Sequence, residues 1–138
     1  MNEDINPELR ERLEALGCPV YCLNRPESHK HPRYLAMLLN IIRKHKIEIV
    51  HAHNYGSKLW GVLCKMSQPN LKLVMTVHDT GIISGLNGFH HWVHGNLIDL
   101  NIAISKAVEA ECRKHGIHNV EQIYNGIPVA AFRVAETA

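Results

Sequence analysis

Two closely spaced histidines, His51 and His53, follow an apolar run and could carry chemistry in this chain. Side chains alternate along a strand, so both imidazoles would point to the same side, roughly 6 to 7 Å apart. A neutral imidazole can bond a hydroxyl or orient a reacting group. We expect one ring to face a cleft while a neighbour holds the other, although either alone could equally be a hydrogen-bonded core histidine.

Polar residues also follow the next two apolar runs. His78 and Asp79 come directly after LKLVMTV, in the stretch TVHDTG, and Ser105 follows LNIAI. The carboxyl ends of parallel strands meet at one edge of a sheet, where open α/β proteins bind ligands. A carboxylate beside an imidazole can set its tautomer or bind a hydroxyl itself. We therefore expect this edge to hold the site, together with Thr80 and Gly81 of the same stretch.

A metal site is the main alternative for these histidines. An H-x-H pair at a strand end occurs in several metal-dependent hydrolases, and His90 and His94 are spaced to share a helix face. The sequence contains no H-E-x-x-H or H-x-H-x-D-H motif, so we assign no metal ligand and read 90–94 as a solvated or acceptor-facing segment. Phosphate-binding glycine motifs are also missing, and Ser57 and Ser105 are better explained as helix caps than as nucleophiles.

Helices and strands alternate almost from end to end in the expected secondary structure. Caps, prolines and apolar spacing predict helices over 7–16, 32–46, 57–67, 89–93 and 106–115, and short apolar runs predict strands over 19–23, 47–53, 71–78, 100–104 and 120–124. This order predicts an α/β fold, Rossmann-like, with a three-layer arrangement of a parallel sheet and helices on both faces. The broad apolar stripe of the helix over 32–46 is expected to pack on that sheet.

Composition excludes several classes of protein. The 138 residues carry a formal charge of +2 and no long basic run, so we expect no nucleic-acid partner. The four cysteines include no C-x-x-C pair, which indicates reduced core thiols and a cytoplasmic protein. No apolar run is long enough to span a bilayer. The basic RKHK at the end of the second helix leaves peripheral contact with the inner membrane surface open.

Four segments, taken in order, resemble a known family. IEIVHAHNYGSKLWG, LKLVMTVHDTG, DLNIAISKAVEAECRKHGI and VEQIYNGIPVAAF are similar to the N-terminal domain of family 4 glycosyltransferases, from about Leu9 to Phe132. The resemblance implies half of a GT-B fold and a retaining transfer of sugar from a nucleotide sugar. In that family the N-terminal domain mainly holds the acceptor, and a second Rossmann-like domain holds the nucleotide.

The resemblance also implies roles for single residues. His78 matches the histidine that contacts the transferred sugar, and we expect it to be catalytic. His51 and His53 match the H-x-H that shapes the same cleft, and Asn125 and Gly126 match the NG before the crossing to the second domain. Helix N-terminal amides after the first histidine pair suit an anion or a sugar hydroxyl. The expected substrate-binding residues are His51, His53, Asn54, Tyr55, Asp79, Thr80, Gly81, Ser105, Asn125 and Gly126.

The match departs from the family at both ends. Segments corresponding to its first strand, Gly-rich loop and nucleotide-binding domain are missing, and Pro128 stands where an acidic residue is common. We therefore expect residues 1–127 to form a partial acceptor-side domain and residues 128–138 to begin a linker or tail. The nucleotide sugar would be a co-substrate held by a domain outside this chain, in cis or in trans, and the chain itself would bind no cofactor.

Several functional expectations follow from this interpretation. The chain would bind a sugar or lipid-linked acceptor as part of a glycosyltransferase in carbohydrate biosynthesis, and alone it would be inactive. Two alternatives stay open: a small His-rich metal-binding or metal-dependent hydrolytic α/β protein, and a non-catalytic subunit whose apolar surface docks a donor-binding chain. An exposed apolar patch would accompany the second alternative.

Overall fold

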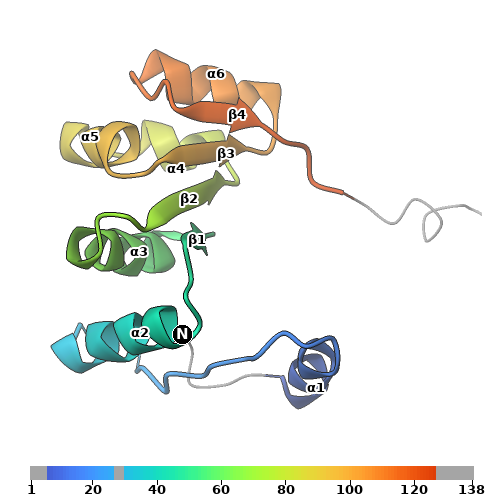
Figure 1. The fold of residues 1–138 in the computed structure, drawn as a ribbon. Helices are drawn as coiled ribbons and strands as arrows, with labels where there is room; N and C mark the ends of the chain where they lie inside the picture. Colours follow the sequence, from blue (N-terminus) through green and yellow to red (C-terminus); the bar gives the residue numbers. More distant parts are fainter. Residues whose placement is uncertain (1–5, 27–29, 127–138) are drawn as a thin grey trace, which may run out of the picture. The chain divides into compact units, whose positions relative to one another are not determined.

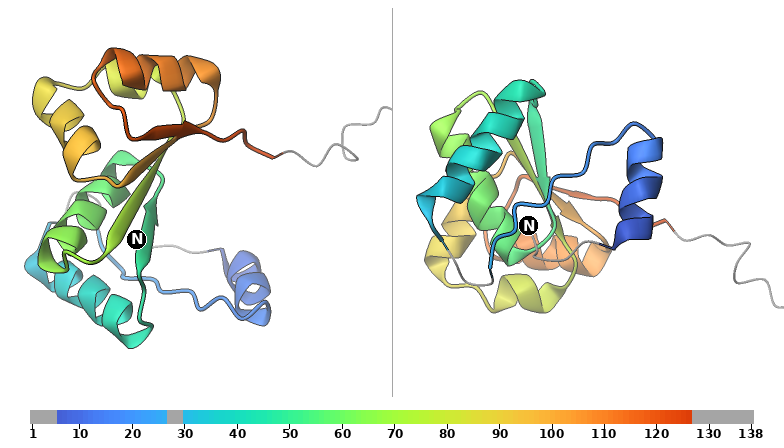
Figure 2. Two further views of the ribbon diagram at one scale, coloured as in Figure 1. Left: turned by 45° about the horizontal axis from the view of Figure 1, so that its top comes forward. Right: turned by 90° about the horizontal axis from the view of Figure 1, so that it is seen from below.

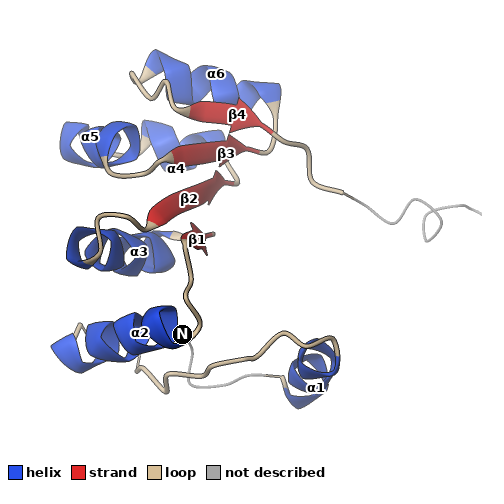
Figure 3. Cartoon of the chain, in the orientation of Figure 1, coloured by secondary structure: helices blue, strands red, loops and turns tan. Residues whose placement is uncertain are grey.

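The computed structural model describes residues 6–26 and 30–126 of the chain. After two initial helices, each strand of this part of the chain is followed by one or two helices, except the last strand (Figures 1 and 3). In chain order the elements are α1 (Pro7–Ala15), α2 (Pro32–Lys44), β1 (Ile49–Ala52), α3 (Tyr55–Ser67), β2 (Lys72–Val77), α4 (Thr80–Ser84), α5 (Gly88–Asn96), β3 (Leu100–Ala103), α6 (Lys106–Lys114) and β4 (Val120–Gln122).

The strands form one sheet in the order β1-β2-β3-β4, with parallel pairing of β2 to β3 and of β3 to β4. Each of these neighbours is joined by a helical crossover, as parallel strands require. The expected α/β class, with a parallel sheet flanked by helices, is confirmed. By internal contacts the chain divides into two compact units, Met1–Leu73 and Val74–Ala138, and each is described by itself below.

The helix boundaries follow local signals in the sequence. Asn6 accepts a hydrogen bond from the amide of Leu9 and Pro7 occupies the first helical position, as expected for the start of α1. After α1 and α6 the chain turns at Gly17 and Gly116, with φ of +79° and +77°. This left-handed conformation suits glycine, and the resulting turns end both helices.

The core of the first unit lies largely between α2 and α3, which pack against each other (Figure 2). The rings of Tyr34 and Trp60 meet edge to face with centroids 6.4 Å apart, and Leu23 completes this cluster. A second cluster joins Ile42 of α2 to Cys64 of α3. The apolar stripe of α2 is thus covered mainly by a helix, whereas the sequence predicted packing on the sheet.

The second unit has its own core beneath the helices α4, α5 and α6. Strands and helices both contribute apolar side chains to this core, as expected when helices pack on a sheet. The fully or almost fully buried members are Met75, Val77, Ile83, Val93, Ile98, Ala103, Val108, Cys112, Ile117 and Val120. Within the described residues, no helix is long and apolar enough to cross a membrane.

The prediction of a strand over 19–23 was wrong. This segment is extended but belongs to no strand, and its contacts are made by side chains. Leu23 is buried against α2 and α3, and the Tyr21 hydroxyl shares a hydrogen bond with the His45 imidazole. A strand needs a partner backbone, whereas a short apolar run can be buried through its side chains alone. The sequence pattern does not separate these two cases.

The stretch 81–96 was expected to hold one short helix and instead holds two. Asp79 caps α4, and Asn87 caps α5 by accepting from the amide of His90 at 3.1 Å. With five residues, α4 is too short to display helical periodicity in the sequence. The sequence analysis considered Asp79 only as a possible partner of an imidazole or a hydroxyl, although its side chain also caps this helix.

Candidate functional site

The paired histidines lie at the carboxyl end of β1 in the first unit. His51 is in the strand and His53 directly follows it, with Ala52 between them buried. Both imidazoles are exposed, and their ring centroids are 4.2 Å apart with an angle of 34° between the planes. The strand alternation thus places both rings on one side, as expected. Together they present a small polar surface.

The turn after this pair is fixed by a reciprocal cap. Asn54 Oδ1 accepts from the amide of Ser57 at 2.8 Å, and Ser57 Oγ accepts from the amide of Asn54 at 3.0 Å. The same hydroxyl accepts from the amide of His53 at 3.2 Å. This capping box starts α3 and holds the backbone that carries the second imidazole. The sequence predicted Ser57 as the cap of a helix that begins near residue 57, but Asn54 is the N-cap, and Ser57 is the third helical residue, whose hydroxyl completes the capping box.

A buried lysine beneath Tyr55 was missed by the sequence analysis. Lys58 is 4% exposed, and its ammonium lies 4.7 Å from the centroid of the Tyr55 ring. Burial lowers the pKa of Lys58 below its usual value of 10.5. The Tyr55 ring itself is 57% exposed, so a cation lies against a ring that is open to ligands. The spacing of three residues in a helix was the signal that could have suggested this pair.

Strand register brings other predicted residues together in the second unit. Val77 pairs with Ala103, and Ala103 pairs with Gln122. The three strands therefore end level with one another, and the ladder continues with the amide of Ile123 donating to the Ala103 carbonyl at 2.9 Å. The segments that begin with His78 and with residue 104 share this edge, as predicted, and the segment that begins with residue 123 joins them.

Two of the polar residues on this edge cap helices. Asp79 Oδ1 accepts from the amide of Gly81 at 2.6 Å and from the Thr80 hydroxyl at 3.4 Å. Ser105 Oγ accepts from the amide of Val108 at 3.3 Å and starts α6. The capping role expected for Ser105 is confirmed. These side chains fix the first turns of α4 and α6 beside the strand ends.

The remaining predicted residues of this unit are exposed. His78 lies between the buried end of β2 and the cap of α4, with its side chain open to solvent. Asn125 and Gly126 are exposed at the end of the described chain. Pro128, and the predicted linker over 128–138, lie outside the described residues. The predicted site residues thus form two sets, the segment 51–55 in one unit and the strand-end edge in the other.

The reading of 90–94 as a solvated segment was wrong for His94. This imidazole is 0% exposed, and its Nδ1 donates to Asn101 Oδ1 at 2.6 Å. Asn101 in turn donates to the His94 carbonyl at 3.0 Å, and Asn119 donates to the same carbonyl at 3.0 Å. The cluster is a buried network that joins α5 to β3. Among the described residues, no group of three or more His, Cys, Asp or Glu side chains could hold a metal ion.

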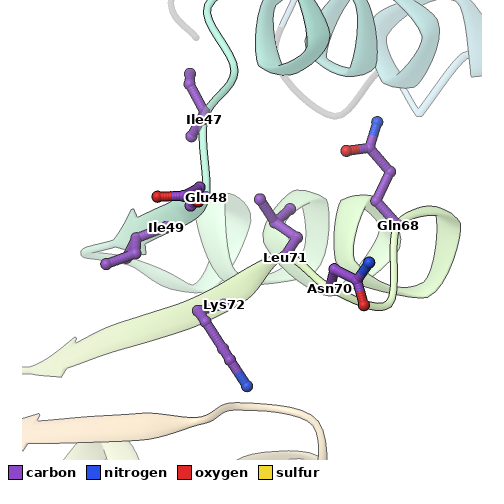
Figure 4. A pocket seen from close by; sticks show the side chains of 7 residues that line it. All are labelled: Ile47, Glu48, Ile49, Gln68, Asn70, Leu71 and Lys72. Carbon is purple, nitrogen blue, oxygen red and sulfur yellow. The ribbon is translucent and has the colours of Figure 1, made fainter.

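The first unit also contains a pocket of about 420 Å³ (Figure 4). It lies where β1 and β2 begin, since Ile49 and Lys72 are the first residues of these strands. His51 and His53 lie at the opposite end of β1, so the pocket is separate from these predicted residues. Its lining residues are Ile47, Glu48, Ile49, Gln68, Asn70, Leu71 and Lys72.

Comparison with known proteins identifies the arrangement. The model of Glycosyltransferase Family 4 matches residues 4–131. Among solved structures, the chain is similar to the crystal structure of HepE from Anabaena in complex with UDP and glucose, with a TM-score of 0.66 and 18% sequence identity. The match covers 96% of this chain and 38% of the HepE chain. No curated protein matched.

Proposed function

The chain belongs to glycosyltransferase family 4, and on this premise we propose that it forms the acceptor-binding part of a nucleotide-sugar-dependent glycosyltransferase. The observation that carries the proposal is the edge formed by β2, β3 and β4 within the matched region. It presents an exposed imidazole, that of His78, directly beside a capped helical turn. The resemblance of TVHDTG to the family motif supports the same residue.

His78 is the proposed catalytic residue. Glycosyl transfer develops positive charge at the anomeric carbon and negative charge on the leaving phosphate. A neutral imidazole can hydrogen-bond a hydroxyl or carbonyl of the reacting sugar and hold it in the reactive orientation. The bond from the amide of Gly81 to Asp79 fixes the turn that follows, so the backbone around the imidazole is held in place before substrate binds.

The first unit supplies a second set of substrate contacts in this proposal. His51 and His53 offer ring nitrogens for hydroxyl groups, and the exposed ring of Tyr55 offers an apolar face on which a sugar can stack. The capping box at Asn54 and Ser57 keeps this segment rigid. Thr80, Ser105, Asn125 and Gly126 complete the proposed set on the strand-end edge.

The donor is proposed to be a nucleotide sugar held by a second domain, in cis or in trans. The HepE structure contains UDP and glucose, and this chain spans 38% of that chain. We propose that a sugar or lipid-linked acceptor binds the residues of this chain, that no cofactor does, and that the protein acts in the cytoplasm or at the inner membrane surface. No nucleic-acid partner is proposed.

Sugar transfer by a longer protein that includes the donor-binding domain, or by this chain mixed with that domain, tests the proposal. With nucleotide sugars as donors and simple glycans as acceptors, His78→Ala is expected to lower kcat by about 10²- to 10³-fold, because a group that orients the reacting sugar is lost. His118→Gln removes another exposed imidazole of the same unit and should leave the rate unchanged. Release of nucleoside diphosphate is the measurement.

The isolated chain of 138 residues provides the complementary test. It is expected to give no transfer from any common nucleotide sugar, because the proposal places the donor on another domain. Robust turnover by this chain alone would contradict the proposal that the donor binds a separate domain. A His78→Ala variant with full activity in the longer protein would contradict the proposed catalytic role.

A further inference from the structure

A second pair of histidines joins the three helices of the Val74–Ala138 unit. His91 of α5 and His115, which ends α6, have ring centroids 4.4 Å apart and an angle of 34° between their planes. Both side chains are partly buried. The pair is distinct from the proposed substrate residues, and the sequence gives no motif for it because the two positions are far apart in the chain.

Each ring of the pair holds one further partner. His91 Nε2 donates to the carbonyl oxygen of Ile83 in α4 at 2.9 Å. This carbonyl also accepts from the amide of Leu86 at 3.1 Å, so the imidazole is its second donor at the end of a five-residue helix. His115 Nε2 donates to Glu111 Oε1 at 3.0 Å. The pair therefore ties α5 to both other helices, in addition to the direct packing of α4 on α6.

The charges around the two rings differ. Glu111 faces His115 and also contacts Lys114 Nζ at 3.4 Å. Burial raises the pKa of Glu111, but hydrogen bonds from His115 and Lys114 outweigh it, so the pKa is lowered and the carboxylate stays ionised. On the other side of His91, residues 80–84 of α4 include no titratable side chain. The other titratable side chains on the packed helices and the following turn are His90, His94, Lys106, Glu109, Cys112, Arg113 and His118.

We propose that His91 and His115 form an acid-sensitive latch that holds α4 against α5 and α6. While the rings are uncharged, they lie against each other at a tilt and His91 anchors the end of α4. When solvent protons occupy both rings, two positive charges lie about 4.4 Å apart. Glu111 compensates the charge on His115, but no α4 side chain compensates the charge on His91, so repulsion displaces His91 and leaves the Ile83 carbonyl with the Leu86 amide alone.

Movement of α4 would affect the proposed site, because α4 begins at proposed substrate residues. Asp79 caps α4, and Thr80 and Gly81 are its first residues. Opening the latch would loosen the turn that carries these three proposed substrate residues. This last step rests on the proposed glycosyltransferase function, whereas the latch itself does not.

Amide hydrogen exchange measured by NMR on the chain tests the latch without any activity assay. The reporting amides are those of Gly85 and Leu86, which donate to the carbonyls of Gly81 and Ile83. Between about pH 7.5 and about pH 5.5, their protection factors are expected to fall about tenfold, because like charges at this distance cost about one tenfold step in an equilibrium. The amide of Ile123, in the strand ladder, serves as the internal reference.

Matched variants separate this pair from the other histidines. His91→Gln keeps an N–H donor for the Ile83 carbonyl but cannot be charged, so protection should hold at neutral pH and the acid loss should vanish. His115→Gln should also abolish the loss, and it replaces the first variant if that one fails to fold. His118→Gln should retain the loss. An acid loss that persists in the foldable Gln variant, or its absence from the original chain, would overturn the latch.

Discussion

At the residue scale, several predicted ligand groups also have structural roles. Asn54, Asp79 and Ser105 each follow a strand, and each caps the next helix with its side-chain oxygen. Short polar residues at strand-to-helix turns satisfy orphan amides whatever else they bind. The sequence therefore predicted their positions well. It could not separate capping from substrate contact, because both uses favour the same residue types.

The sequence was least informative about buried polar residues. His94 looked like a member of a solvated cluster, yet it bonds Asn101 in the interior. Lys58 lies buried against an aromatic ring, although lysines are rarely fully buried. The partner of His94 lies on another element and is brought close only by the fold. The partner of Lys58 lies three residues away in the same helix. No linear motif identifies such a partner.

The cysteines give a prediction at this scale. The described residues form no disulfide, and Cys18 is exposed, so the expectation of four core thiols was wrong for it. Cys64 and Cys112 are buried, and burial raises the pKa of each thiol to about 11. The thiolate is the reactive form, so at about pH 8 a raised pKa alone lowers its population about 100-fold.

Alkylation with iodoacetamide, followed by peptide mass spectrometry, checks this difference. At about pH 8, Cys18 should be modified first, whereas Cys64 and Cys112 should react only slowly until the protein is denatured. A raised pKa means that a higher pH is needed for ionisation. The slow native reaction of Cys112 should therefore keep accelerating up to about pH 11. Equal native rates for Cys18 and Cys112 would contradict the assigned burial.

At the element scale, caps and glycines predicted most helices, while strand pairing was harder to foresee. The strand over 47–53 proved to be the four residues of β1, and the expected strand over 19–23 did not form. A helix is specified by its own residues, whereas a strand depends on a neighbour that is distant in sequence. The short helix α4 was missed because five residues are too few for a periodic signal.

Gly61 gives a prediction for the packing of α3. A Cβ at this position would lie 2.6 Å from Leu73 Cδ1, and Leu73 is 0% exposed. Overpacking of this kind costs about 1–3 kcal/mol, and the better helix propensity of alanine offsets up to about 1 kcal/mol. Gly61→Ala should therefore lower the free energy of unfolding by about 1 kcal/mol, measured by urea denaturation.

Gly56, in the first turn of the same helix, provides the matched control. Its Cβ would meet only Asn54 Oδ1, at 3.5 Å, which is ordinary van der Waals contact. Gly56→Ala should be neutral or stabilise the protein by up to about 1 kcal/mol. Equal effects of the two substitutions would show that helix propensity alone decides stability at Gly61.

At the scale of the whole molecule, the order of segments was the most informative feature of the sequence. The alternation of expected helices and strands predicted the α/β class, and four segments in order predicted the family. Both are confirmed by the fold and by the family match over 4–131. The division into units at Leu73 and Val74 was not foreseen. It depends on how many contacts each part makes with itself, which no local pattern records.

The helix α1 should contribute little to the stability of the folded chain. None of its residues is buried, and Leu9 and Leu16, two of its apolar stripe, are 52% and 79% exposed. A helix that buries no side chain adds little to the stability of the folded chain.

Removal of residues 1–17 should therefore change the free energy of unfolding by less than about 0.5 kcal/mol. Leu23→Ala is the comparison, because that side chain is 5% exposed between Tyr34 and Trp60. It should cost about 2–5 kcal/mol, the usual loss for a buried leucine. Urea denaturation followed by tryptophan fluorescence, to which Trp60 and Trp92 both contribute, measures both. A truncation as costly as Leu23→Ala would mean that the leucines of α1 are buried in solution, and that the apolar stripe is part of the core.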